Sequence, residues 1–162
     1  MYDRILVPTD GSPGMDSVVA HAASLAEVHG ATLDFVYVVN TAAFANLPME
    51  TSWEGLSETL RDEGEAALDA AAEAAGDVPH ERHLLEGGPS REITAYANRS
   101  GADLVVMGTH GRGGIDRILL GSVAERVVRS SSVPVLTVRV GEPPADADVD
   151  ADRAAEPPTD EE

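Results

Sequence analysis

Strand-like and helix-like segments alternate along most of the chain, and this alternation limits the fold more than any other feature of the sequence. Apolar and β-branched runs predict strands at residues 2–8, 32–39, 79–86, 103–107 and 133–140. Apolar residues at a spacing of three or four predict helices at residues 16–29, 53–75, 89–99 and 122–129. Because strands that alternate with helices are joined by right-handed crossovers, we expect an α/β fold with one parallel sheet and helices on both faces.

The composition separates one domain from a C-terminal extension. A chain of 162 residues is long enough for a single domain with a sizeable core, and we assign that domain to residues 1–140. Residues 141–162 show no hydrophobic periodicity and hold nine of the 29 acidic residues. We therefore expect this segment to be an acidic, Pro/Asp/Glu-rich disordered tail.

The chain is strongly acidic: its net charge is −18, and all 11 basic residues are arginine because lysine is absent. The negative electrostatic field of such a chain argues against nucleic acid or an anionic membrane as a partner. An acidic, lysine-free surface also suggests a halophilic source, with an ordinary acidic protein as the alternative. There are no cysteines, no apolar run long enough to cross a bilayer and no basic start of a signal peptide, so we expect a cytoplasmic protein.

Five glycines lie between Gly108 and Ser122, in the stretch that joins a buried strand to the last helix. Glycine is unfavourable there unless a turn requires a positive φ or a ligand approaches the backbone closely. Ser122 and Glu125 form the S-x-x-E pattern of a capping box, which places the start of the last helix beside the glycines. Backbone amides and a positive helix end suit phosphate oxygens, whereas close packing alone would account for Gly113 and Gly114.

A second loop, residues 8–12, follows the first strand and contributes Asp10. Ligands of open α/β sheets bind at the carboxyl ends of strands, where the order of connection reverses. If the first strand and the strand at residues 103–107 are central neighbours, this loop meets the glycine-rich one. Asp10 is then placed for the hydroxyl pair of a ribose, a role compatible with capping of the following turn or helix.

The spacing Gly108-x2-Gly111-x9-Gly121-Ser122 resembles the ATP-binding signature of the universal stress protein family, G-x2-G-x9-G-(S/T), at every fixed position. The stretches VPTDGS after the first strand and SVPVLTV near the end are also similar to that family. The resemblance covers residues 2–140. It implies a single flavodoxin-like, Rossmann-like domain of five parallel strands in the order 3-2-1-4-5, which binds ATP with or without Mg²⁺ or Mn²⁺ held through the phosphates.

The same resemblance implies which residues bind the nucleotide. The nucleoside side would consist of Pro8, Thr9, Asp10, Val38, Met107 and Gly108. Here Asp10 would hold the ribose, and the backbone of Val38 would meet the adenine. The phosphate side would consist of His110, Gly111, Arg112, Gly121, Ser122 and Val123. Ser122 would use its hydroxyl, while the two glycines and Val123 would use their amides.

The function implied is a nucleotide-dependent sensor or adaptor of the stress response, with no catalytic residue and no protein-held metal. A Walker A loop is excluded because it requires lysine. A loose likeness of residues 10–17 to the pyrophosphatase loop of ATP-dependent ligases is weakened by Pro13, which lacks an amide, and by aspartate where that loop begins with serine. The alternatives are an adenine-nucleotide hydrolase with slow ATP hydrolysis and a nucleotide-free scaffold dimer.

The last strand, from Val133 to Val140, would lie at a sheet edge in this strand order. It is apolar and has no lysine, although exposed edges are normally protected by charge or cover. Two copies could pair these edges antiparallel about a two-fold axis. Members of the family commonly dimerise through this strand, so we expect a homodimer.

Overall fold

The computed structural model describes residues 1–44, 53–110 and 120–140. The predicted acidic tail, the loop residues 45–52 and the two predicted site residues Gly111 and Arg112 lie outside the described residues. Among the described residues, no helix has the length and apolar character needed to cross a membrane.

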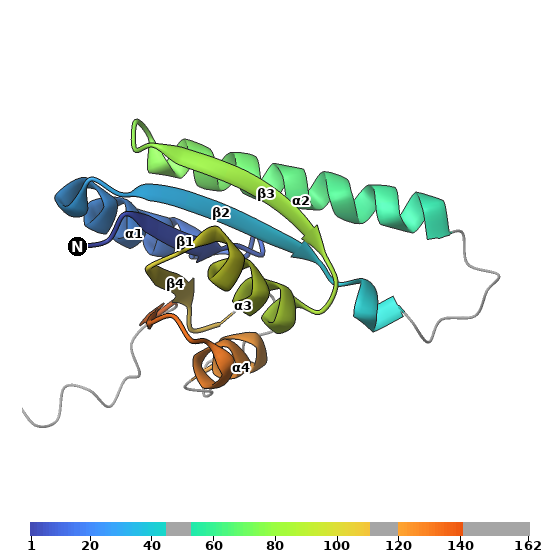
Figure 1. Ribbon diagram of the computed structural model, residues 1–162. Coiled ribbons are helices and arrows are strands. Elements are labelled where there is room, and N and C mark those ends of the chain that lie inside the picture. The colour runs from blue at the N-terminus through green and yellow to red at the C-terminus, as the bar shows by residue number, and fades with distance from the viewer. Residues whose placement is uncertain (45–52, 111–119, 141–162) are drawn as a thin grey trace, which may run out of the picture.

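The sheet has five parallel strands in the order β3-β2-β1-β4-β5, which confirms the predicted topology (Figure 1). The strands are β1 Arg4–Pro8, β2 Thr32–Val39, β3 His80–Glu86, β4 Leu104–Gly108 and β5 Val135–Val138. The register places Ile5 of β1 between Leu33 of β2 and Leu104 of β4, all of them buried. The centre of the sheet is therefore apolar on both faces, as expected for strands covered by helices on each side.

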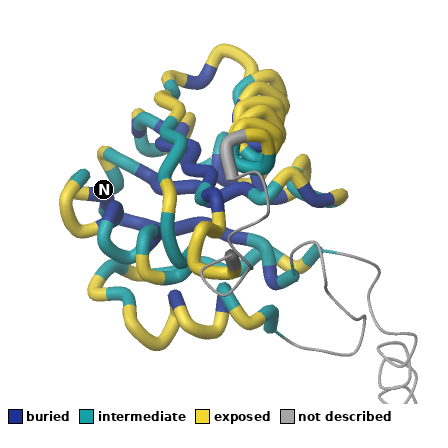
Figure 2. Tube along the Cα trace, turned by 90° about the vertical axis from the view of Figure 1, so that its right-hand side faces the viewer, coloured by how far each residue is buried: buried dark blue, intermediate teal, exposed yellow. Residues whose placement is uncertain are grey.

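Two helices cover each face of the sheet. The helices are α1 Met15–His29, α2 Trp53–Ala75, α3 Pro89–Ser100 and α4 Ser122–Ser130, with a short 3₁₀ turn η1 at Thr41–Phe44. Helices α1 and α2 pack with Ile5, Val7 and Phe35 in one core, whereas α3 and α4 pack with Leu6 and Val36 in the other. The tube view shows the buried strands between two helical layers whose outer surfaces are exposed (Figure 2).

The predicted element ends agree with the structure to within about two residues, and β5 is the strand that is shortened at both ends. Before β5, the Ser131 hydroxyl donates to the Val133 carbonyl at 2.7 Å, and the Val133 amide donates back to that hydroxyl at 3.1 Å. After β5, the Val140 amide donates to the Thr109 hydroxyl oxygen at 3.3 Å. The regular ladder is confined to Val135–Val138, and after it the Val140 amide bonds to a side chain instead of to the β4 backbone.

The predicted capping box at the start of α4 is wrong. The N-cap residue is Gly121, no side chain caps the helix, and Ser122 is already its first residue. The Glu125 amide accordingly donates to the Gly121 carbonyl at 2.8 Å, and the Glu125 carboxylate pairs with Arg129 one turn later. The S-x-x-E pattern therefore located the helix start to within one residue, but its hydrogen bonds do not form.

Candidate functional site

A cavity of about 540 Å³ opens at the carboxyl ends of β1, β2 and β4. This is the point where the chain reverses its order of connection, because β1 lies between β2 and β4. Ten of the twelve predicted site residues line it, and the other two fall outside the described residues. The ten are Pro8, Thr9, Asp10, Val38, Met107, Gly108, His110, Gly121, Ser122 and Val123.

The loop after β1 fixes Asp10 at the cavity wall. The Thr9 amide continues the ladder to the Val36 carbonyl at 2.9 Å, so the chain is still part of the sheet at this point. The Ser12 amide then donates to Oδ1 of Asp10 at 2.9 Å, and Gly11 adopts a φ of 69° that favours glycine. Asp10 thus caps its own turn and not α1, which begins at Met15. The residue lies on the cavity lining, and its carboxylate is an acceptor group.

The two described glycines of the signature are required for different reasons. A Cβ on Gly108 would lie 3.0 Å from Val140 Cγ2 and 3.3 Å from the His110 carbonyl oxygen, so close packing explains this glycine. Gly121 has an extended backbone, with φ −68° and ψ 156°, that any residue can adopt. Its amide donates to the Thr109 carbonyl at 2.6 Å, so the prediction that this amide binds a phosphate is wrong, although the residue lines the cavity. Backbone strain therefore gives no reason for glycine at position 121.

Sequence reasoning missed nine residues of the lining: Met15, Val36, Tyr37, Asn40, Pro89, Ile93, Thr109, Leu120 and Ala124. Pro89 and Ile93 belong to the first turns of α3, so the N-terminal ends of both α3 and α4 meet the cavity. Pro89 at the first helical position was the available signal, because a helix that starts just after a strand begins at the carboxyl edge of the sheet. Two helix N-termini make this wall favourable for negative charge.

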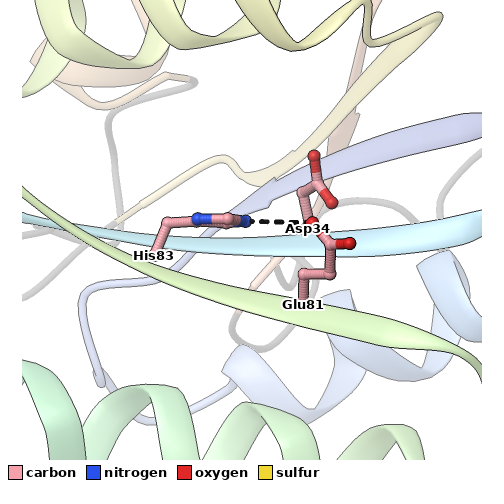
Figure 3. A group of neighbouring side chains, drawn as sticks. All are labelled: Asp34, Glu81 and His83. Carbon is pink, nitrogen blue, oxygen red and sulfur yellow. Dashed lines mark ion pairs between the residues drawn. The ribbon is translucent and has the colours of Figure 1, made fainter.

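A second polar cluster lies at the opposite end of the sheet. Asp34 of β2 is fully buried and accepts two hydrogen bonds from Nη1 of Arg4, at 2.6 and 2.8 Å, and one from the Tyr96 hydroxyl at 3.3 Å. Glu81, the neighbour of Asp34 in β3, accepts from the same Nη1 at 3.3 Å. His83 Nε2 lies 3.5 Å from the Glu81 carboxylate (Figure 3).

These contacts shift the pKa values of the cluster. The hydrogen bond to Asp34, followed by its charge, raises the pKa of Arg4 above its ordinary value. Burial raises the pKa of Tyr96 to about 12, and the charge of Asp34 adds to that shift. Arg4 is therefore permanently charged and Tyr96 neutral near pH 7, which is the arrangement that a buried aspartate carboxylate needs.

The ligand atoms of Asp34, Glu81 and His83 lie within 4.8 Å of one another, a spacing that could hold a metal ion (Figure 3). The Arg4 guanidinium already supplies the positive charge here, because it hydrogen-bonds to both carboxylates. A divalent cation would have to displace Arg4 or accept its repulsion at contact distance. The cluster is therefore better described as an ion-pair network that secures this end of the sheet.

Comparisons with known proteins agree with the fold. The profile of the Universal stress protein family matches residues 1–139. Universal stress protein MJ0531 of Methanocaldococcus jannaschii is 43% identical over 141 residues, which cover 86% of this chain and 83% of that protein. A universal stress protein of Thermus aquaticus is 36% identical over 142 residues, which cover 86% of this chain and all of that protein.

Solved structures give the same result. The structure of protein MJ0577 superposes with a TM-score of 0.78 at 28% identity and covers 88% of this chain and 99% of its own. A universal stress protein in complex with cAMP superposes with a TM-score of 0.67 at 27% identity and covers 86% of this chain and 99% of its own. On the family match and these relatives together, the chain belongs to the universal stress protein family.

Proposed function

We propose that the cavity binds an adenine nucleotide, with ATP as the native ligand. The observation that carries this proposal is the convergence of ten predicted positions on one cavity at the switch point of the sheet. A volume of about 540 Å³ lies within the usual range of small-ligand pockets, roughly 300–1,000 Å³. The related protein in complex with cAMP supports an adenine nucleotide as the ligand class.

The chemistry of the lining divides the site into two parts. On one side, Asp10 offers a carboxylate to the ribose hydroxyls, and the backbone of Val38 at the end of β2 meets the adenine. On the other side, the first amides of α4 at Ser122 and Val123 receive phosphate oxygens, helped by the helix dipole. Gly111 and Arg112 complete the phosphate side in this proposal, and Mg²⁺ or Mn²⁺ would be held through the phosphates.

The role that fits this site is a nucleotide-dependent sensor or adaptor. Among the described lining residues, the only side chains that could serve as a general base near neutral pH are Asp10, which holds its own turn, and His110. A multiple-turnover ATPase assay tests the alternative of a true hydrolase. Turnover of ATP in the common enzyme range, about 1–1,000 per second, would show that the protein is an enzyme and not a sensor.

The direct test is identification of the bound molecule. Protein purified without added nucleotide is denatured, and the released small molecules are identified by mass spectrometry. Calorimetry then measures the affinity of stripped protein for ATP, cAMP and, as a base control, GTP. We expect adenine nucleotides to bind with preference over GTP. The proposal fails if the stripped, folded protein binds none of them.

We also propose a homodimer through β5, which is an edge strand of the sheet. All four of its residues are only half-buried, although three are apolar. The other edge, β3, is protected because it exposes the charged side chains of Glu81, Arg82 and Glu86. The difference between the two edges favours β5 as the strand that another copy covers.

The register of β5 identifies the groups that would pair. The carbonyls of Pro134 and Val138 accept from the Val105 and Thr109 amides, so these residues face β4. Because strand residues alternate, Thr137 directs its amide to the outer edge. Light scattering in molar KCl, where the charge is screened, should give about twice 16.9 kDa for the wild type. Thr137→Pro should give a monomer and Thr137→Val a dimer; a monomeric wild type would exclude this interface.

A further inference from the structure

The two helical layers of the protein carry opposite charge. Helices α1 and α2, on one face of the sheet, hold nine acidic residues and one arginine. Helices α3 and α4 pack into one core on the other face and hold two acidic residues and four arginines, all four of them exposed: Arg91, Arg99, Arg126 and Arg129 (Figures 1 and 2). We call this outer surface of α3 and α4 the arginine face. It is positive although the chain as a whole has a net charge of −18.

Most arginines of this face have no carboxylate partner among the described residues. The three described arginines that precede α3 all form ion pairs with carboxylates. On the arginine face, Arg129 pairs with a glutamate one turn earlier, and its side chain is still 77% exposed. Arg99 lies over the Tyr96 ring, and neither Arg99 nor Arg91 nor Arg126 has an ion pair within the described part of the chain. The face is therefore open to an acidic partner.

The acidic tail, residues 141–162, has the composition that complements this face. It holds nine acidic residues and one arginine, with aspartate at every second position from Asp146 to Asp152. It follows β5, and Val135 of β5 packs in the same core as α3 and α4. A chain spans at most about 3.3–3.6 Å per residue, so a segment of this length can reach both helices.

A second copy of the protein could also offer acidic groups, through its α1 and α2 surface. The tail is favoured over this occupant because it is covalently attached. Attachment through a short flexible segment gives an effective concentration in the millimolar range, whereas a second copy binds at its own concentration in solution. The difference matters here, because a single exposed ion pair contributes little and docking needs several of them together.

We infer that the acidic tail docks on the arginine face of its own chain, through exchangeable ion pairs with the arginines of α3 and α4. Electrostatic complementarity selects this face, because the α1 and α2 layer would repel the tail. Docking is then controlled by ionic strength: the Debye length falls from about 10 Å at 0.1 M salt to about 3 Å at 1 M. The tail covers the arginine face in dilute salt and leaves it in concentrated salt.

A single spin label on the full chain tests this contact, because the protein contains no cysteine. Ala154→Cys carries the nitroxide, and the amide signals of ¹⁵N-labelled protein are recorded in molar KCl and at the lowest KCl concentration at which circular dichroism shows a folded protein. We expect the label to broaden amide signals of α3 and α4 in dilute salt and to lose this effect in molar KCl. Equal broadening of α1 and α2, or no broadening in dilute salt, would overturn the inference.

Charge variants of the labelled chain show which groups carry the contact. The double variant Arg126→Gln with Arg129→Gln should reduce the broadening of α3 and α4. Arg61→Gln with Arg82→Gln removes the same charge outside the arginine face, so it is the matched control and should leave the broadening unchanged. Replacing the four aspartates from position 146 to 152 by asparagine should abolish it. Equal reductions in the two double variants would mean that net charge alone acts, and would overturn the inference.

A mixing experiment identifies the chain that supplies the tail. Spin-labelled protein without ¹⁵N is mixed with ¹⁵N-labelled wild type that carries no spin label. We expect no broadening of α3 and α4 in the wild type of this mixture, because each arginine face is covered by its own tail. Broadening in the mixture as strong as in the singly labelled protein would assign the contact to a second copy and overturn docking within one chain.

Discussion

The two ends of this parallel sheet differ in how their polar groups are used. At the amino end, carboxylates have hydrogen-bond partners: Asp34 accepts from Arg4 and Tyr96, and Asp103 accepts two backbone amides. At the carboxyl end, the chain instead surrounds a cavity with Asp10, small residues and two helix N-termini. Carboxylates that already have protein partners are not available to a ligand. Helix N-terminal amides that face a cavity, in contrast, contribute little to stability. We therefore expect stability to depend on the first end and the proposed nucleotide binding to depend on the second.

The largest loss of unfolding free energy is expected from Arg4→Ala at the amino end of the sheet. The change leaves the buried Asp34 carboxylate without its main partner, and breaking such a pair typically costs about 3–5 kcal/mol of unfolding free energy. Urea denaturation measures this loss, while calorimetry on the remaining folded protein should show unchanged ATP affinity.

The matched control for this variant is Arg61→Ala. Arg61 pairs with Glu86 at a surface where both side chains are about half exposed, so its loss should cost less than about 1 kcal/mol. If both variants lose the same stability, the buried network does not secure this end of the sheet. If Arg4→Ala also abolishes ATP binding in folded protein, the separation of the two ends is wrong.

Gly121→Val is the corresponding change at the carboxyl end. The extended backbone accepts valine, so the fold should be retained, but the side chain would occupy the volume assigned to the phosphates. We expect ATP affinity to fall on the order of 100-fold, or nearly 3 kcal/mol, by calorimetry.

Gly88→Val provides a close control for Gly121→Val. Gly88 is likewise a helix N-cap with extended backbone, at φ −81° and ψ 120°, and has open space around a Cβ. It should retain full ATP affinity. Unchanged affinity in a folded Gly121→Val protein would remove the phosphate site from this wall of the cavity.

The sequence predicted the two ends unequally well. Alternating periodicity predicted the strands and helices, and the family resemblance predicted the strand order and about half of the cavity lining, because these depend on local patterns. The ion-pair network could not be found in this way, since Arg4, Asp34 and Tyr96 are far apart in the chain. They meet only through the register of β1 with β2 and the packing of α3 against the sheet. The one available signal was an aspartate within the otherwise apolar run TLDFVYVV. A charge at such a position has to find a partner.

The smallest loss of unfolding free energy is expected from a substitution of Asp103, which lies just before β4. Its Oδ2 accepts the amides of Asp3 and Arg4 at 2.7 and 3.0 Å, and these hydrogen bonds lower its pKa below the ordinary value of 3.8. A carboxylate with a lowered pKa stabilises the folded state above the unfolded pKa, and this contribution is lost as pH falls through the folded value. Asp103→Asn replaces a charged acceptor by a neutral one, so at pH 7 it should cost about 1 kcal/mol.

The pH dependence of this variant distinguishes the hydrogen bonds from general packing. Urea midpoints of wild type and Asp103→Asn should converge as pH falls from about 5 to below the ordinary aspartate value, because the wild-type carboxylate becomes protonated there. Asp62→Asn, on the exposed face of α2, should follow the wild type at every pH. A difference that persists at the lowest pH would mean that Asp103 acts through packing. ATP affinity should be unchanged in both variants, because Asp103 lies at the end of the sheet that does not meet the cavity.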